Sequence, residues 1–250
     1  LLEAGYTVGA FSSPAFISYE DQISINNMAL TETEFLDLVN EILPFIQTYE
    51  NEKQVALSEF EILTAMMFYY FAKHPVDFVI VETGMGGRLD STNVCVPILT
   101  VITNVGLDHI QFLGGTKEEI ATEKAGIIKS SVPLVTTEED PNILQLFKNR
   151  TAQNNTNLYA YKTDFHVSDI SQEMASQHFN YQSYFGAKEQ YGITMLGVHQ
   201  IKNAALALMA VDYLQYTIGY DIENDARRRG LSKANWLGRL ERIGYKPLIY

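Results

Sequence analysis

Two segments of this chain carry residue types that could bind a divalent cation beside a phosphate group. The first is an apolar run, residues 78–81, which ends at the carboxylate of Glu82 and continues into a glycine-rich stretch. The second is another apolar run, residues 98–103, which leads to His109. Ligands bind where the strands of parallel sheets end, and carboxylate and imidazole groups both coordinate divalent metals. The spacing therefore predicts a metal site built from two neighbouring strand ends.

Each of these residues also has an ordinary structural explanation. Glu82 could simply reach solvent at the strand end, and a lone histidine such as His109 is more often structural than a ligand. The three glycines within residues 84–87 permit a sharp turn and a close approach to a ligand, although turns account for most glycine clusters. Arg88 and Asp90 could form only a local ion pair. The occurrence of Glu82 together with His109 favours the metal site.

Lys124 is the third residue whose position suggests chemistry. Residues 117–129 show the spacing of a helix with an apolar inner face. That face carries Ile120, Ala121, Ile127 and Ile128. Lys124 lies three or four residues from each of them, on the same stripe, where lysine is rarely fully buried without a partner. Either its stem packs while the ammonium reaches water, or the amine points into a site.

Composition limits the classes of function. The chain has 250 residues, of which 46% are hydrophobic, so a sizeable core is possible in one or two domains. A formal net charge of −12 argues against non-specific binding to nucleic acid or anionic membranes, so an anionic substrate would need local cations, a metal or backbone amides. No apolar stretch reaches the ~18 residues of a membrane span. The single cysteine, Cys95, excludes an internal disulfide framework and suits a reducing, cytoplasmic compartment.

Local signals place the elements that must position these residues. Capping boxes at residues 31–34, 58–61 and 116–119 predict three helix starts, and the pair at residues 140–141 predicts a fourth. The first of these helices is expected to bury Phe35, Leu38, Val39, Ile42 and Phe45. Strands are expected at residues 7–12, 22–26, 77–82, 98–103 and 132–136.

This alternation predicts an α/β fold with a mostly parallel sheet flanked by helices. Residues 158–195 change character, because polar and aromatic residues alternate there, and they predict a small antiparallel ribbon at the sheet edge. Residues 196–203 are expected to lead into a strongly apolar helix that begins at Asn203 and runs to about residue 216.

Taken together, these motifs resemble the folylpolyglutamate synthase and dihydrofolate synthase family within the Mur ligase superfamily. The matching segments are residues 12–14 (SSP), 58–61 (SEFE), 81–93 (VETGMGGRLDSTN), 102–109 (ITNVGLDH), 113–114 with 120–129 (LG, IATEKAGIIK), 197–204 (GVHQIKNA) and 236–241 (WLGRLE). Their order matches the family, and residues 82–93 and 108–129 are highly specific together. The resemblance covers nearly the whole chain and is weakest from about residue 140 to residue 190.

The resemblance implies a Mur-ligase-like central ATP-binding domain in residues 1–246, with residues 247–250 beginning a further C-terminal ligase domain. Neither the family's phosphate-binding loop nor its C-terminal domain is found in these 250 residues. The resemblance thus implies a fragment that is inactive alone. Ala15 stands where many members have a histidine after Ser-Pro.

The implied activity is ATP-dependent amide ligation. ATP phosphorylates the carboxylate of a folate, the amine of L-glutamate attacks the acyl phosphate, and phosphate leaves, while Mg²⁺ neutralises phosphate oxygens. By position, the Mg²⁺ ligands would be Ser13, Glu82, His109 and Lys124. His109 and a carbamylated Lys124 would be the catalytic residues, because a carbamate turns a cation into an anion that binds metal.

The resemblance also implies contacts to the two organic ligands. Asn203 and Arg239 would bind ATP. The pterin or pteroate pocket would be lined by Ser58, Glu59, Phe60, Glu61, Leu89, Asp90 and Ser91. Four of the implied residues also have plain explanations: Ser13 as a turn hydroxyl, Glu61 as a helix cap, Asn203 as a helix start and Arg239 as surface charge.

Three alternatives remain open at this point. Dihydrofolate synthase activity on dihydropteroate, alone or combined with polyglutamation, fits the same motifs. A truncated, non-catalytic nucleotide- or folate-binding remnant is the second. A Mur-type ligase of cell-wall precursors is the third, and residues 86–93 speak against it. The partners expected are a folate or dihydropteroate and L-glutamate, with no nucleic acid or membrane, for a cytoplasmic protein that is monomeric at full length.

Overall fold

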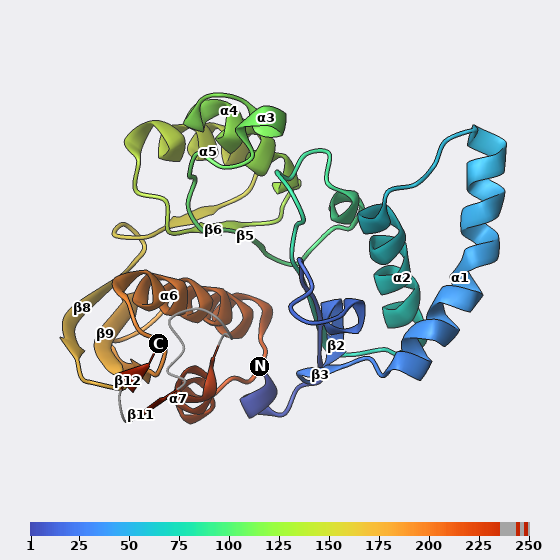
Figure 1. Cartoon of the computed structure of the whole chain (residues 1–250). Coiled ribbons are helices and arrows are strands. Elements are labelled where there is room, and N and C mark those ends of the chain that lie inside the picture. Colours follow the sequence, from blue (N-terminus) through green and yellow to red (C-terminus); the bar gives the residue numbers. More distant parts are fainter. Residues whose placement is uncertain (236–243, 246–247, 250) are drawn as a thin grey trace. The chain divides into compact units, whose positions relative to one another are not determined.

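A computed structural model describes residues 1–235, 244–245 and 248–249 (Figure 1). The chain divides into two compact units, each of which is described by itself. The N-terminal unit contains residues 2 and 4–96, and the C-terminal unit contains residues 1, 3 and 97–250. The segment that includes Arg239 lies outside the described residues.

A four-stranded sheet organises the N-terminal unit, with the order β3-β2-β1-β4. Its strands are β1 (Val8–Phe11), β2 (Ile23–Ile25), β3 (Met28–Ala29) and β4 (Phe78–Val81). β1 and β4 pair in parallel, whereas β2 is antiparallel to both β1 and β3. Short 3₁₀ helices at Leu2–Ala4 and Tyr19–Gln22 precede β1 and β2. The first two expected strands are confirmed.

β4 is less buried than its apolar sequence predicts. Val79 and Ile80 are 40% and 56% exposed, and only Phe78 of this strand is buried. The reason lies in the order of the sheet, because β4 is an edge strand whose strand neighbour in this unit is β1.

Two helices pack against this sheet, α1 (Glu32–Lys53) and α2 (Glu59–Lys73), and each begins at a capping box as predicted. Their apolar residues share one core with Phe11 of β1 and Ile23 of β2. The expected burial of Phe45 is wrong, since its side chain is 66% exposed. The buried stripe of α1 instead steps by four residues, through Leu38, Ile42 and Ile46. Each step of four turns about 40° past a full helical turn, so the stripe drifts away from Phe45.

The C-terminal unit begins with a parallel sheet of β5 (Thr100–Ile102), β6 (Leu134–Thr136) and β7 (Leu158–Ala160). Three helices, α3 (Ile110–Leu113), α4 (Lys117–Lys124) and α5 (Pro141–Gln153), follow its strands in the chain. A 3₁₀ turn, Ala125–Ile127, extends α4. Ile120 of α4 and Phe147 of α5 share a core with Leu134, so these helices cover one face of the sheet.

The next side chain of β6 faces the other layer. Val135 packs with Ile201, Ala205 and other residues of α6 (Val198–Tyr213). Successive side chains of a strand point to opposite faces, so α6 covers the face that α4 and α5 leave open. Figure 1 shows α6 between this sheet and a second sheet. The predicted α/β fold with helices on both faces of a parallel sheet is confirmed.

The second sheet is antiparallel and contains β8 (Phe165–Gln172), β9 (Gln177–Ser183) and β10 (Glu189–Ile193) in the order β10-β9-β8. The predicted antiparallel strands are present from residue 165 onward. The prediction is wrong in two respects, because residues 158–160 belong to the parallel sheet and the antiparallel strands form a separate sheet and not a ribbon at its edge. A π-helical turn, Leu214–Ile218, and helix α7 (Asn224–Lys233) follow α6. The last described strands, β11 (Gly244–Tyr245) and β12 (Leu248–Ile249), pair with each other.

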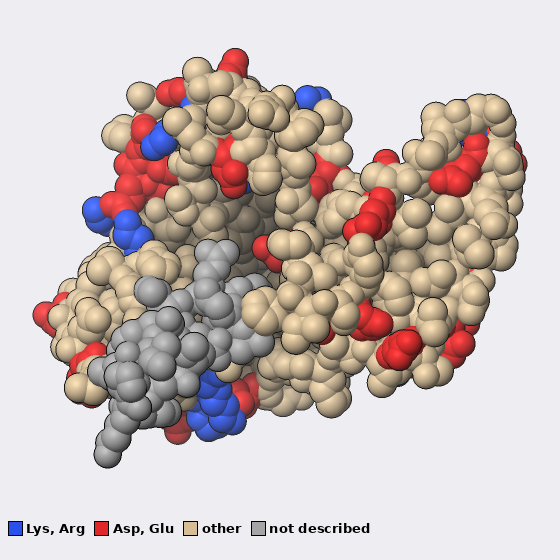
Figure 2. Space-filling view, in the orientation of Figure 1, with Lys and Arg blue, Asp and Glu red and all other residues tan. Residues whose placement is uncertain are grey.

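Acidic groups dominate the charge of the surface. In Figure 2, red acidic atoms are spread over the visible face of both units, whereas blue basic atoms are confined to a few patches. This distribution fits the net charge of −12. No helix among the described residues is long and apolar enough to cross a membrane.

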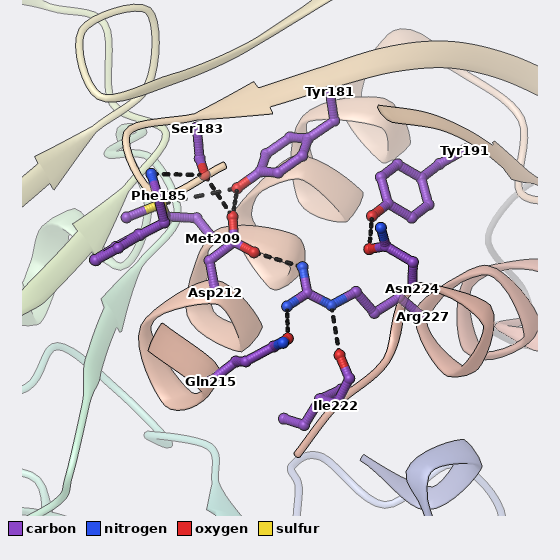
Figure 3. Close-up of polar contacts among 10 residues, drawn as sticks. All are labelled: Tyr181, Ser183, Phe185, Tyr191, Met209, Asp212, Gln215, Ile222, Asn224 and Arg227. Atoms are coloured by element: carbon purple, nitrogen blue, oxygen red, sulfur yellow. Dashed lines mark hydrogen bonds and ion pairs between the residues drawn. The ribbon is translucent and has the colours of Figure 1, made fainter. Parts of the chain in front are cut away.

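One buried polar network joins three elements of the C-terminal unit (Figure 3). Asp212 of α6 and Arg227 of α7 form an ion pair and are 3% and 8% exposed. The other carboxylate oxygen of Asp212 accepts hydrogen bonds from the hydroxyls of Tyr181 at 2.8 Å and Ser183 at 2.6 Å. Burial, more than the nearby Asp212 carboxylate, raises the pKa of Tyr181 well above its ordinary value. The phenol therefore stays a donor at every physiological pH.

The fold of the C-terminal unit should depend strongly on this pair. Arg227→Met removes the cation and leaves the Asp212 carboxylate buried among neutral donors, so we expect a loss of about 3–5 kcal/mol in the free energy of unfolding. Urea unfolding followed by circular dichroism measures it. The exposed Arg228→Met is the control and should change the value by less than about 1 kcal/mol. Equal losses for the two variants would contradict the assignment.

Candidate functional site

The structure brings Ser13 and Glu82 together. β1 and β4 are parallel neighbours, so the residues that follow them leave the sheet at the same edge. The backbone N–H of Ser13 donates to the Glu82 carboxylate at 3.3 Å, and the N–H of Glu82 donates to the carbonyl of Phe11 at 2.9 Å. Glu82 is exposed and Ser13 is half-buried. A serine hydroxyl and a carboxylate thus share one open strand edge.

The chain beyond Glu82 packs on the start of α2. A Cβ atom at Gly84 would lie 2.5 Å from the ring of Phe60, so glycine is required for this close approach. The hydroxyl of Ser91 lies 3.3 Å from that of Thr64 on α2. Two of the segments with a predicted substrate contact, residues 58–61 and 89–91, are therefore neighbours within this unit.

Several of the predicted substrate residues have a structural role in this arrangement. The Asp90 carboxylate accepts the N–H groups of Met85 and Thr92, each at 2.9 Å, and so closes the turn between them. Ser58 and Glu61 form the capping box of α2, and the hydrogen bonds from the Ser58 hydroxyl and N–H lower the pKa of Glu61. Contacts of these three residues with a substrate stay predictions.

Two of the remaining residues of this group, Leu89 and Glu59, are exposed, whereas Phe60 packs against the core. Leu89 is 79% exposed. Glu59 is also exposed and accepts a hydrogen bond from the hydroxyl of Tyr19 at 3.0 Å. Phe60 is half-buried, and its ring centroid lies 5.8 Å from that of Phe11 on β1. The exposed Leu89 and the ring of Phe60 are apolar groups of the kind that contact a flat heteroaromatic ligand.

His109 and Lys124 belong to the C-terminal unit. His109 precedes α3 with a φ of 50°, a left-handed conformation that non-glycine residues seldom adopt. Its Nε2 lies 3.6 Å from the carboxylate of Asp108, and nearly half of its side chain is exposed. Lys124 is the last residue of α4 and is half-buried, although Ile120 and Ala121 on the same helix are fully buried. Of the predicted inner face, Ile120, Ala121 and Ile128 are buried and Ile127 is half-buried. The helix is shorter than predicted, because α4 ends at Lys124 and a 3₁₀ turn follows.

Asn203 lies inside α6, which begins at Val198, so the expected helix start at Asn203 is wrong. Its side chain is exposed. Its side-chain NH₂ group donates to the side-chain oxygen Oε1 of Gln200 at 3.2 Å. The neighbouring Lys202 forms an ion pair with Glu139, which also pairs with Lys162. These ion pairs, first Lys162 and then Lys202, lower the pKa of Glu139. The predicted contact of Asn203 with ATP stays a prediction.

Two residues with marked contacts were missed in the sequence. Tyr19 has no recognisable pattern, since its contact with Glu59 joins residues forty positions apart. Glu138 could have been found, because it follows an apolar strand as Glu82 does. It is buried, and its carboxylate accepts three backbone N–H groups.

The donor groups can be compared with the requirements of Mg²⁺, which prefers hard oxygen ligands. Ser13 and Glu82 supply such oxygens. Among the described residues the Glu82 carboxylate accepts one long hydrogen bond, from the N–H of Ser13, so lone pairs remain for a ligand. His109 offers an exposed ring nitrogen. An unmodified Lys124 would repel the cation, so its place in the set requires the carbamate. No group of three or more His, Cys, Asp or Glu side chains arranged for a metal occurs among the described residues. Ser13 and Glu82 fit Mg²⁺ on these terms. The ligand roles of His109 and of a carbamylated Lys124, and the convergence of the four residues, stay predictions.

The chain belongs to the Mur ligase middle domain family, whose family model matches residues 25–211. It is 41% identical over 251 residues to the dihydrofolate synthase/folylpolyglutamate synthase of Bacillus subtilis, covering 100% of this chain and 58% of that relative. It is 30% identical to the folylpolyglutamate synthase of Lacticaseibacillus casei, covering 100% of this chain and 59% of the relative. The chain thus spans less than two thirds of the length of these curated relatives.

A solved structure described as an FPGS–AMPPCP–folate complex has the same fold. The TM-score is 0.92 at 30% sequence identity, and the match covers 99% of this chain and 60% of that one. The resemblance inferred from the motifs is therefore confirmed for the family and for the fold.

The contact between Gly84 and Phe60 leads to a prediction. Gly84→Ala places a methyl group 2.5 Å from the Phe60 ring, closer than van der Waals contact, so the ring or the turn must move. We expect this to lower the free energy of unfolding by about 1–3 kcal/mol. Thermal or urea unfolding measures the change. Gly115→Ala is the matched control, because nothing lies within 4 Å of a Cβ atom there. An unchanged stability of Gly84→Ala would show that the close approach is not required.

Proposed function

We propose that the protein to which this chain belongs is an ATP-dependent ligase that adds L-glutamate to the carboxylate of a folate. The observation that carries the proposal is the match of nearly the whole chain, at a TM-score of 0.92, to a complex of FPGS with AMPPCP and folate. The relatives named above support the same activity. Residues 1–246 would form the central ATP-binding domain and residues 247–250 the start of a further domain.

The reaction asks the protein mainly to position groups and to stabilise charge. A folate carboxylate takes the terminal phosphoryl group of ATP, and the amine of L-glutamate displaces phosphate from the acyl phosphate. Mg²⁺ supplies positive charge to the phosphate oxygens. The residues that would hold it are Ser13, Glu82, His109 and a carbamylated Lys124.

Other residues of the chain would orient the organic substrates. The exposed Leu89 and the half-buried Phe60 would contact the pterin. Asp90 and the capping box of α2 would hold the backbone of the two segments that carry these side chains. Asn203 would hold the nucleotide together with Arg239. The exposed amide of Asn203 is free to turn toward a ligand once its bond to Gln200 is exchanged. We place the full-length protein in the cytoplasm as a monomer without nucleic-acid or membrane partners.

Dihydrofolate synthase activity is a second candidate, because the Bacillus subtilis relative carries both names. The two activities differ in the substrate that bears the carboxylate. Purified full-length protein is assayed for ADP release with ATP, L-glutamate and either tetrahydrofolate or dihydropteroate. Turnover with tetrahydrofolate supports the main proposal, turnover with dihydropteroate adds the second, and no turnover with either contradicts both.

The metal ligands lead to a prediction about Mg²⁺ dependence. Glu82→Gln or His109→Ala in the full-length protein should raise the Mg²⁺ concentration for half-maximal activity by roughly 10- to 100-fold. Initial rates over a magnesium titration measure this value. Glu52→Gln, which neutralises an exposed carboxylate of α1, is the control and should leave it unchanged. An unaltered magnesium requirement in Glu82→Gln would remove Glu82 from the proposed set.

The carbamate leads to a separate prediction. Lys124→Ala should abolish most activity, and short carboxylates such as formate or acetate should restore part of it by taking the place of the carbamate. Rates of the variant are compared with and without the added carboxylate. Activity of Lys124→Ala equal to that of the unsubstituted protein, without additive, would exclude the role.

A further inference from the structure

Glu138 is a buried carboxylate that the proposed function leaves unexplained. It is 6% exposed and follows β6, the central strand of the parallel sheet in the C-terminal unit. Its Oε1 accepts the N–H groups of Glu139 and Asp140, each at 2.8 Å. Its Oε2 accepts the N–H of Val105 at 2.6 Å. Burying a carboxylate is costly, so these three donors stabilise its charge.

A local role accounts for only half of this arrangement. The bonds to Glu139 and Asp140 hold the chain where α5 begins, but Asp140 already caps that helix through the N–H of Asn142. The bond to Val105 is of another kind, because it reaches across to the chain that leaves β5, thirty-three residues earlier. It is also the shortest of the three.

Further bonds join the same two strand ends. The carbonyl of Thr103 accepts the N–H of Thr137 at 3.0 Å and its hydroxyl at 2.8 Å. The side chain of Val105 is itself buried in the core that contains Ile120 and Ala121 of α4. Val105 is thus held by its backbone to Glu138 and by its side chain to the helix that carries Lys124.

His109 follows Val105 by four residues. The segment between them ends in the left-handed conformation of His109, which directs the chain into α3. Residues 106–109 are exposed, and Val105 is the buried residue that precedes them. Mutation of groups that orient a metal ligand without touching the metal typically lowers metal affinity by roughly 10- to 100-fold.

We propose that Glu138 is a positioning residue, whose buried carboxylate fixes the turn at residues 103–109 and thereby holds His109 in place for the divalent cation. The inference rests on the proposed function, because it takes His109 as a cation ligand. Glu138 touches neither substrate nor metal in this role and acts through the N–H of Val105.

Glu138→Gln tests the proposal directly. The amide keeps one carbonyl oxygen for Glu139 and Asp140, but it turns an NH₂ group toward the N–H of Val105, so two donors face each other. We expect hydrogen exchange of the Val105 amide to accelerate roughly tenfold. We also expect the Mg²⁺ concentration for half-maximal activity of the full-length protein to rise roughly tenfold. Electron paramagnetic resonance of bound Mn²⁺ measures the cation affinity independently of turnover.

Two further variants complete the experiment. Glu139→Gln is the matched control, since it neutralises the adjacent carboxylate, which pairs with Lys162 and Lys202, and should leave exchange at Val105 unchanged. Glu138→Asp keeps the charge and shortens the side chain by one methylene. It replaces Glu138→Gln if that protein does not fold, and the same two shifts are expected.

The outcomes separate this proposal from the proposed function. Faster exchange at Val105 without a change in cation affinity overturns the positioning role, and so does unchanged exchange. If His109→Ala shifts the magnesium requirement and Glu138→Gln does not, the role of Glu138 fails while the metal site stands. If His109→Ala has no effect, the ligand role of His109 fails, and a positioning role for Glu138 fails with it.

Discussion

Parallel pairing of neighbouring strands is the constraint on which the candidate site depends. Two parallel strands end at the same edge of a sheet, so the chain segments beyond them are neighbours whatever their separation in sequence. The pairing of β1 with β4 brings Ser13 to Glu82 across sixty-nine residues. The pairing of β5 with β6 likewise brings Val105 to Glu138 across thirty-three.

Helices pack against the faces of both sheets and so fix the positions of the strand ends. In the N-terminal unit, α1 and α2 share a core with β1 and β2, and the ring of Phe60 fills the space that Gly84 leaves open. In the C-terminal unit, two successive side chains of β6 point to opposite faces of the sheet. Leu134 packs on α4 and α5, and Val135 packs on α6. The Asp212–Arg227 pair and the Tyr181 hydroxyl join α6, α7 and β9 by polar contacts, in addition to the apolar core that these elements share.

Local signals were predictable from the sequence because they depend on residues a few positions apart. The three capping boxes and the proline after Asp140 all mark helix starts in the structure. The exposure of Phe45 was not predictable in this way. Which side of α1 is buried depends on its packing partners on α2 and the sheet, and these are distant in sequence. The contact of Tyr19 with Glu59 depends on the fold alone.

The two carboxylates that follow strands show what residue type alone can and cannot predict about a side chain's role. Glu82 and Glu138 follow similar apolar strands, and the sequence alone does not separate them. A carboxylate has about four lone-pair sites. In Glu138 three are taken by backbone N–H groups at 2.6–2.8 Å in a buried setting, which commits the group to structure. In Glu82 one long bond of 3.3 Å at an exposed edge leaves most of this capacity for a ligand. The donors around each group, and not its position after a strand, therefore separate the carboxylate that holds the chain from the one whose lone pairs remain for a ligand.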